Sequence, residues 1–402
     1  MRHPLAELPR EVWLIGLISL VNDGASELIY PLLPLYLSSV LMAGPRALGL
    51  IEGVAEATAS LLKLFSGVVV DRTRRVKPWI VGGYGLAALA RPLIALAASW
   101  PALLLLRFFD RVGKGLRTSP RDALLAGCVD PRQRGLAFGV HRAMDNAGAV
   151  VGPLVGALLL AQQVPLRQII LGAALPGALC VALSLCLRER PPATPTAEPA
   201  ASFDWRVGSL PPELRRYLAV VALFSLGNSS NLFLLLRAQA LGVPAAQVPL
   251  LWATVSTVAM VFAAPLAGWS DRVGRWQLLV GGYGAYGLFY LLLGNLPLGG
   301  LPLGGVALFA LFGFYGLFMA ATEGVEKALV ADLSPPEQRG RAFGWFNLTS
   351  GALLLPASIL FGWLYQAVSP AAAFGFSASC SLGAALLLAR FRPGSRGVFA
   401  SH

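Results

Sequence analysis

Apolar residues occur along this chain in long unbroken runs that short polar breaks separate. A helix needs about 20 consecutive apolar residues to cross a hydrocarbon core of about 30 Å. By that rule the chain holds about twelve such runs, at residues 11–39, 47–70, 78–99, 101–127, 136–160, 165–187, 217–240, 247–269, 276–296, 303–330, 340–366 and 371–389. Their length and lack of alternation predict an all-α membrane protein with transmembrane helices rather than the short strands of an outer-membrane barrel.

Composition agrees with this pattern. Hydrophobic residues make up 56% of the 402 positions and charged residues only 13%, which is outside the usual range of soluble domains. The four cysteines (Cys128, Cys180, Cys186 and Cys380) lie in or beside apolar runs without metal-like spacing, so we expect them to be small core residues.

Lysine and arginine mark one side of the membrane. They gather in the breaks after even-numbered runs, such as Arg72 to Lys77 and Arg188 to Arg216, and are almost absent from the other breaks. The positive-inside rule then predicts that both termini are cytoplasmic. The first run lacks a small-residue cleavage site and reads as a retained span. Topology and anionic lipid account for the net charge of +12 without a nucleic-acid partner.

The chain consists of two related halves. The longest polar break, RERPPATPTAEPAASFDWRVGSLPPELRR, lies near the middle and is rich in proline and alanine. GVVVDRTRR before it resembles AGWSDRVGR after it, and DPRQRGLAFG resembles SPPEQRGRAFG. We therefore predict two six-helix bundles, residues 1–190 and 215–402, joined by a cytoplasmic linker at 191–214. Parallel repeats of this kind are one plan of secondary transporters.

Two loop motifs carry a family resemblance. The break after the second run has Gly67, Asp71, Arg72, Arg75 and Lys77, with Arg74 where glycine is usual. The second copy has Asp271, Arg272, Gly274 and Arg275, with Ala267 in place of the leading glycine. In these motifs, and in its overall plan, the chain resembles the major facilitator superfamily over essentially its whole length. The resemblance implies small-molecule transport in the inner membrane of a bacterium by a multi-pass monomer.

A third motif lies in the fifth run. Gly148, Gly152, Pro153 and Gly156 match the antiporter signature of that superfamily, and the eleventh run lacks it. The resemblance implies export of a compound against protons. In physical terms the glycines share one helical face, which allows a neighbouring helix to approach, and Pro153 bends the helix. Plain helix packing without any bearing on transport direction is the alternative interpretation.

The fourth run is interrupted by a charged stripe, Arg107, Asp110, Arg111 and Lys114, at helical spacing. Charges at membrane depth normally face a bundle interior or a water-filled cavity and pair with one another. The resemblance implies that runs one, four, seven and ten line a central cavity. Polar residues on these other runs then become candidate substrate or coupling residues, namely Asp23, Glu27, Tyr30, Asn228, Asn231 and Glu323.

The cytoplasmic ends of the runs predict a gate. Alignment of the two halves places Arg121 opposite Glu326 and Asp122 opposite Lys327, with inverted charge, so we expect these pairs to attract when the cytoplasmic mouth closes. Asp71 and Asp271 could dock against a helix N-terminus or an arginine of the other half. The alternatives are contact of Arg121 with lipid phosphate and, for the aspartates, solvated turns.

Proton coupling requires a carboxyl group that gains and loses a proton. Asp23 is the leading candidate, because it lies near mid-span in a polar patch. The other acidic candidates are Glu27, Glu52, Glu56, Asp110 and Asp145. The alternative is that these carboxylates only neutralise the basic stripe. We expect His141, a lone histidine, to be structural.

The sequence therefore predicts a secondary active transporter, most simply a proton-driven exporter of small organic solutes. The alternatives are an importer or exchanger of an anionic metabolite or metal chelate, which the basic stripe would suit, and a transporter-like sensor. An enzyme is not expected, because the chain has no P-loop, no HExxH motif and no nucleophile elbow, and its three histidines are dispersed. No cofactor and no metal site is predicted.

Overall fold

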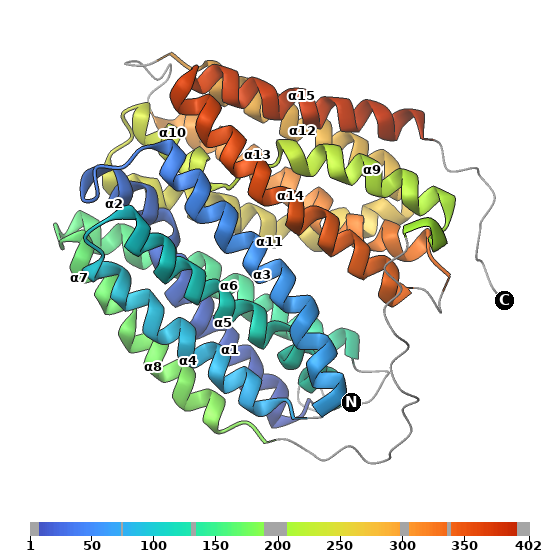
Figure 1. Cartoon of the computed structure of the whole chain (residues 1–402), viewed down its shortest axis with the longest axis horizontal. Coiled ribbons are helices and arrows are strands. Elements are labelled where there is room, and N and C mark those ends of the chain that lie inside the picture. The colour runs from blue at the N-terminus through green and yellow to red at the C-terminus, as the bar shows by residue number, and fades with distance from the viewer. Residues whose placement is uncertain are drawn as a thin grey trace. The chain divides into compact units, whose positions relative to one another are not determined.

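The computed structural model describes residues 8–73, 75–129, 134–188, 207–297, 305–335 and 339–391. In these ranges the chain is helical or looped, without strands, and each predicted apolar run falls on helix, which confirms the all-α fold (Figure 1). The first half contains α1 (Arg10–Ile29), η2 (Tyr30–Leu32), α2 (Leu33–Ser39), α3 (Pro45–Thr73), α4 (Lys77–Leu93), η3 (Ile94–Leu96), α5 (Trp100–Gly127), α6 (Arg134–Ala161), α7 (Leu166–Gly172) and α8 (Ala174–Leu185). The second half contains η5 (Val207–Ser209), α9 (Pro212–Gly227), α10 (Leu232–Ala240), η6 (Ala245–Gln247), α11 (Val248–Val273), α12 (Arg275–Asn295), α13 (Gly305–Asp332), α14 (Arg339–Ala367) and α15 (Pro370–Arg390).

Ten stretches of the described helices are long and apolar enough to cross a membrane. The remaining two predicted spans lie on α3 and α5, which are 29 and 28 residues long. Their length suffices, but both carry several charged residues within the span. The chain is thus a multi-pass membrane protein, and α3 and α5 as spans stay predictions.

Two spans are interrupted. In the first span, Pro31 and Pro34 lack the N–H that a continuous α-helix needs, and a 3₁₀ turn, η2, separates α1 from α2. In the seventh, α9 ends at Gly227 and α10 begins at Leu232. The freed backbone groups find partners there: the Tyr286 hydroxyl donates to the Gly227 carbonyl over 3.1 Å. Such internal satisfaction is what allows non-helical backbone at membrane depth.

The helices form two compact units, and two helices are shared between them. One unit combines most of the first half with Ala245–Ala253, and the other combines most of the second half with Ala43–Gly53. Hence α3 divides after Gly53 and α11 divides after Ala253, at the same spacing that separates Asp71 from Asp271 in the first pair of repeated motifs. The predicted bundle boundaries stay a prediction, because residues 191–206 of the predicted linker lie outside the described residues.

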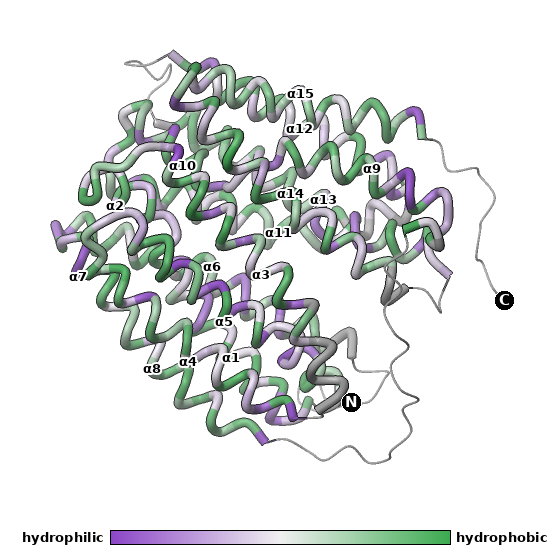
Figure 2. Tube along the Cα trace, in the orientation of Figure 1, coloured by the Kyte–Doolittle hydropathy of each residue, from purple (hydrophilic) through white to green (hydrophobic). Residues whose placement is uncertain are grey.

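The interiors of the units differ in chemistry. In the first unit, an apolar cluster that includes Val12, Ile18 and Tyr84 adjoins buried charges, and α5 shows hydrophilic positions along its length (Figure 2). In the second unit, aromatic rings fill the core, and Phe224 stacks on Tyr283 with ring centroids 4.1 Å apart. The first unit therefore supplies most of the candidate ionic chemistry.

Candidate functional site

The charged stripe of α5 is buried, and its acid is bound by two arginines. Asp110 is fully buried. Its carboxylate accepts from Arg91 Nε over 2.8 Å and pairs with Arg107 Nη1 over 3.2 Å. Arg91 also donates to the Asn22 backbone and side-chain oxygens, over 3.1 and 3.0 Å. The Asp110 carboxylate and the Arg91 guanidinium thus connect α1, α4 and α5. Asp110 therefore has a structural role as a buried, paired charge.

Two further arginines of α5 also have partners. Arg111 Nη2 lies 2.9 Å from Glu56 Oε1 of α3. The guanidinium of Arg117 lies over the Tyr84 ring, 4.6 Å from the centroid, as in a cation–π contact. Lys114, between them in sequence, is half-buried. The stripe is therefore largely neutralised within its own unit, and two of its arginines are bound by carboxylates.

The acidic residues of α1 face other elements. Asn22 Nδ2 donates to Asp23 Oδ1 over 2.7 Å, and the carboxyl groups of Asp23 and Asp145 lie within hydrogen-bonding reach of each other. Glu27, one turn further along α1, accepts from the Trp252 indole N–H over 2.8 Å. The Tyr30 and Trp252 rings lie 5.3 Å apart. Asp23, Glu27 and Tyr30 therefore line one polar region of the first unit.

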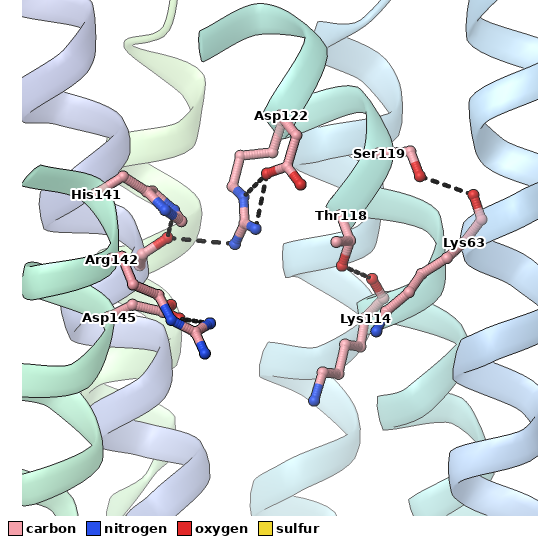
Figure 3. A network of polar contacts seen from close by, with 10 residues as sticks. Lys63, Lys114, Thr118, Ser119, Asp122, His141, Arg142 and Asp145 are labelled. Atoms are coloured by element: carbon pink, nitrogen blue, oxygen red, sulfur yellow. Dashed lines mark hydrogen bonds and ion pairs between the residues drawn. The ribbon is translucent and has the colours of Figure 1, made fainter. Parts of the chain in front are cut away.

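Helix α6 presents a row of polar side chains to this region. His141, Arg142 and Asp145 follow one another along it (Figure 3). Arg142 Nη1 pairs with Asp145 Oδ2 over 3.4 Å, and His141 Nε2 lies 2.8 Å from Ser19 Oγ of α1. Asp145 thus meets a carboxyl group and a guanidinium at once.

Glycines make this close contact of α1 and α6 possible. A Cβ on Gly148 would lie 2.4 Å from the Leu20 carbonyl oxygen, and a Cβ on Gly152 would lie 2.6 Å from that of Gly24. Gly156 is less crowded, with 3.4 Å to Leu28. Pro153 lies inside α6. The antiporter-type motif therefore sits where α6 carries Asp145 against Asp23.

This crowding predicts the effect of one added methyl group. Gly148→Ala should lower the free energy of unfolding by about 1–3 kcal/mol, because helix backbones must separate to admit it. Gly139→Ala is the matched control on the same helix, since nothing lies within 4 Å of its Cβ. Thermal unfolding in detergent of both variants measures the difference. Equal stability of the two variants would show that the contact of α1 with α6 is not tight.

Arg121, Asp122 and Glu326 of the predicted gate have partners within their own units. Arg121 Nη2 bonds Asp122 Oδ1 over 2.8 Å, and Tyr283 donates to Glu326 Oε1 over 2.8 Å. Lys327 is exposed. The expected pairing of Arg121 with Glu326 and of Asp122 with Lys327 stays a prediction.

The loop motifs are described only in part. Arg75 and Arg272 are exposed. The side chains of Gly67, Asp71, Arg72 and Asp271 lie outside the described residues. The docking predicted for Asp71 and Asp271 therefore stays a prediction as well.

In the second unit the polar residues of the seventh span surround the interruption between α9 and α10. Asn231 Oδ1 accepts from the Tyr315 hydroxyl over 2.7 Å, and the Tyr286 hydroxyl lies 3.4 Å from Asn228 Oδ1. Glu323 on α13 is exposed. Tyrosine hydroxyls thus orient both asparagine side chains.

Several contacts escaped the sequence interpretation. Arg91 is the main partner of Asp110, and Trp252 is the partner of Glu27 although 225 positions separate them. Glu56 binds Arg111, which agrees with the alternative that some acids neutralise the basic stripe, although the sequence did not single out this pair. A buried arginine within an apolar run was the one available signal for Arg91; nothing local marks Trp252.

Metal chemistry has no support in the part of the chain that the structure describes. No group of three or more histidine, cysteine, aspartate or glutamate side chains there could hold a metal ion. The four cysteines are free thiols.

Comparison with known proteins shows which chains are similar. A sequence profile described as Major Facilitator Superfamily matches residues 15–322 and 217–399. An uncharacterized MFS-type transporter of Methanocaldococcus jannaschii is 33% identical over 395 residues, 95% of this chain and 95% of that protein. The multidrug resistance protein MdtH of Photorhabdus laumondii is 28% identical over 346 residues, 84% of this chain and 82% of that protein.

Solved structures show the same fold. The nucleoside transporter NupG superposes with a TM-score of 0.79 at 14% identity, over 95% of this chain and 100% of that one. A peptide transporter POT superposes with a TM-score of 0.79 at 15% identity, over 96% of this chain and 94% of that one. At such identities the likeness concerns the fold alone.

Proposed function

Because the chain belongs to the major facilitator superfamily, we propose that it is a secondary active transporter that exports a small organic solute in exchange for protons. The relatives named as multidrug resistance proteins support the choice of solute and direction. The observation that carries the proposal is the pair of carboxyl groups of Asp23 and Asp145.

Two carboxyl groups within hydrogen-bonding reach of each other can share a proton. Neither carboxylate has a hydrogen to donate, so a hydrogen bond between them requires that one is protonated. Two negative charges at such a distance also repel each other strongly. The pair is therefore a proton-binding site between two helices, α1 and α6. A shift of either helix that separates the carboxyl groups would favour release of the proton.

The other acids are less suited to this role. Asp110 is held by Arg91 and Arg107, which keep it ionised. Glu56 is held by Arg111. Because Asp110 and Glu56 are held in ion pairs, Asp23 with its partner Asp145 is the better candidate for the group that couples transport to protons. The ion pairs also count against the anionic importer, because Arg107 and Arg111 already have carboxylate partners.

We place the solute contacts at polar groups near this pair and at the seventh span. Glu27, Tyr30 and Trp252 combine a carboxylate with two aromatic rings, a set that suits an organic cation. Lys114 is a further candidate of the first unit, and Asn228, Asn231 and Glu323 are the separate candidates of the second. Since no covalent chemistry is involved, no cofactor is required.

The proposed setting is the bacterial inner membrane with both termini in the cytoplasm. It rests on the distribution of lysine and arginine between the breaks of the apolar runs. We keep a monomer as the expected state.

Drug accumulation in cells tests the proposal. Efflux-deficient bacteria that express the protein should accumulate less of some compound in a labelled panel of cationic drugs, anionic amphiphiles and metal chelates. A protonophore should abolish the difference from cells with empty vector, because it removes the proton gradient. Higher accumulation of an anion would support the importer instead. No effect across the panel would contradict export of these classes.

A further inference from the structure

One turn before the Asp23 and Asp145 pair along both helices lies a second pair that joins the same two helices. Ser19 precedes Asp23 by four residues on α1, and His141 precedes Asp145 by four residues on α6. Residues at this spacing lie on one face of a helix, about 5–6 Å apart. The Ser19 hydroxyl and His141 Nε2 are 2.8 Å apart, and both residues are buried. The interface of α1 and α6 therefore holds two polar pairs, one turn apart.

The Ser19 and His141 pair is connected to solvent. Arg121 Nη1 donates to Ser19 Oγ over 3.4 Å, and the same guanidinium bonds Asp122 (Figure 3). The Asp122 side chain is 42% exposed, whereas that of Arg121 is 15% exposed. The buried imidazole thus stands between an exposed carboxylate on one side and the shared carboxyl pair on the other.

From this arrangement we infer that His141 is the proton-relay residue through which the Asp23 and Asp145 pair exchanges protons with the cytoplasmic face. The inference rests on the proposed function, since it needs the carboxyl pair to bind a proton and the termini to be cytoplasmic. Ser19 is a positioning residue, because it holds the ring but does not carry the proton. Imidazole suits the role because one of its ring nitrogens can accept a proton while the other donates one.

The charge balance of the relay step is simple. The Arg121 guanidinium can only donate, so the Ser19 hydroxyl keeps its own hydrogen for His141 Nε2. A proton from the cytoplasmic side binds Nε2, the ring nitrogen without a hydrogen, as the Ser19 hydroxyl rotates to accept from the new N–H, and an imidazolium forms. The Nδ1–H bond then breaks as an O–H bond forms on the carboxylate of Asp145, directly or across one water molecule. The ring is then neutral with its hydrogen on Nε2, proton exchange with water returns the hydrogen to Nδ1, and the carboxyl pair has gained one proton.

The charges around His141 suit a transient imidazolium. Asp122 of α5, Asp23 of α1 and Asp145 of α6 are acidic, while Arg121 of α5 and Arg142 of α6 are basic. The two arginines oppose a permanent positive charge on the ring, and the acids make a short-lived one accessible. A ring that stayed charged would trap the proton instead of passing it on.

The test follows protonation of the carboxyl pair directly and needs no solute. Purified protein is placed in liposomes with its termini facing outward, and a light-triggered caged proton is added outside. Time-resolved infrared absorption then reports the protonated carboxyl group, and its loss in Asp23→Asn assigns the band. In His141→Gln the rate of protonation should fall at least about tenfold, because a positioned acid or base contributes about 10²–10⁴ in rate.

Glutamine is the informative substitution because its amide can still bond Ser19 but cannot carry a proton at neutral pH. Imidazole added to the buffer should restore the rate in His141→Gly. Ser19→Ala should slow protonation while Ser19→Thr retains it, and these variants keep the test valid if a His141 variant does not fold. A wild-type rate in folded His141→Gln would overturn the relay. Absence of any carboxyl band that depends on Asp23 would contradict the proposed function itself.

Discussion

Asp23→Asn is expected to abolish transport driven by a proton gradient while leaving exchange of solute across the membrane intact. Asparagine keeps the size and hydrogen-bonding capacity of the side chain, so it can still bond Asp145, but it cannot release a proton. In liposomes with an imposed pH gradient, solute accumulation should fall to the level of protein-free liposomes. Exchange of labelled for unlabelled solute at equal pH should continue, because it requires no net proton movement.

Glu11→Gln is the matched control for this substitution. Glu11 lies in the first turn of the same helix and outside the site, so its neutralisation should leave gradient-driven accumulation unchanged. If Asp23→Asn also lost exchange, Asp23 would act in solute binding rather than in coupling. If Asp23→Asn kept gradient-driven accumulation, the carboxyl pair would not be the coupling site.

Asp110→Asn is expected to have the largest effect on stability. The substitution removes a negative charge that pairs with both Arg91 and Arg107, each of them almost fully buried. Removal of one partner from a buried ion pair costs about 3–5 kcal/mol, because the remaining charge is left uncompensated. Unfolding in detergent with increasing denaturant should therefore show a much lower free energy of unfolding for this variant.

The control for Asp110 is the same change at an exposed pair. Asp332 lies 3.1 Å from Arg275, and its side chain is 52% exposed. Exposed ion pairs contribute less than about 1 kcal/mol, so Asp332→Asn should be close to the native stability. Equal effects of the two substitutions would show that the Asp110 centre is solvated and not a structural core of the first unit.

The sequence predicted the helices and the local ion pair, because both depend on spacing along one helix. Apolar run length placed every described span, and the three-residue step from Arg107 to Asp110 placed that pair. The relation between helices was harder to predict. Arg91 and Trp252 reach their partners across helix interfaces, and no local pattern encodes the rotation of one helix against another.

The two glutamates of α3 are a second case in which a local sequence pattern does not predict the contacts of a helix. Glu52 and Glu56 lie four residues apart, a spacing that puts them on one face of a helix. The division of α3 after Gly53 assigns Glu52 to the second unit and Glu56 to the first, where it binds Arg111. The assignment of Ala43–Gly53 to the second unit and of Ala245–Ala253 to the first depends on the whole fold, and helical periodicity does not predict it.

The direction of proton movement tests the central claim most directly. Liposomes that contain the purified protein and a fluorescent pH indicator are mixed with the compound whose accumulation the cellular panel shows to be lowered. Under antiport, entry of that compound must expel protons, so the lumen should become more alkaline, and Asp23→Asn should abolish the change. Acidification of the lumen would show symport, and an unchanged pH during measured uptake would show transport without protons; either result would contradict proton-coupled export.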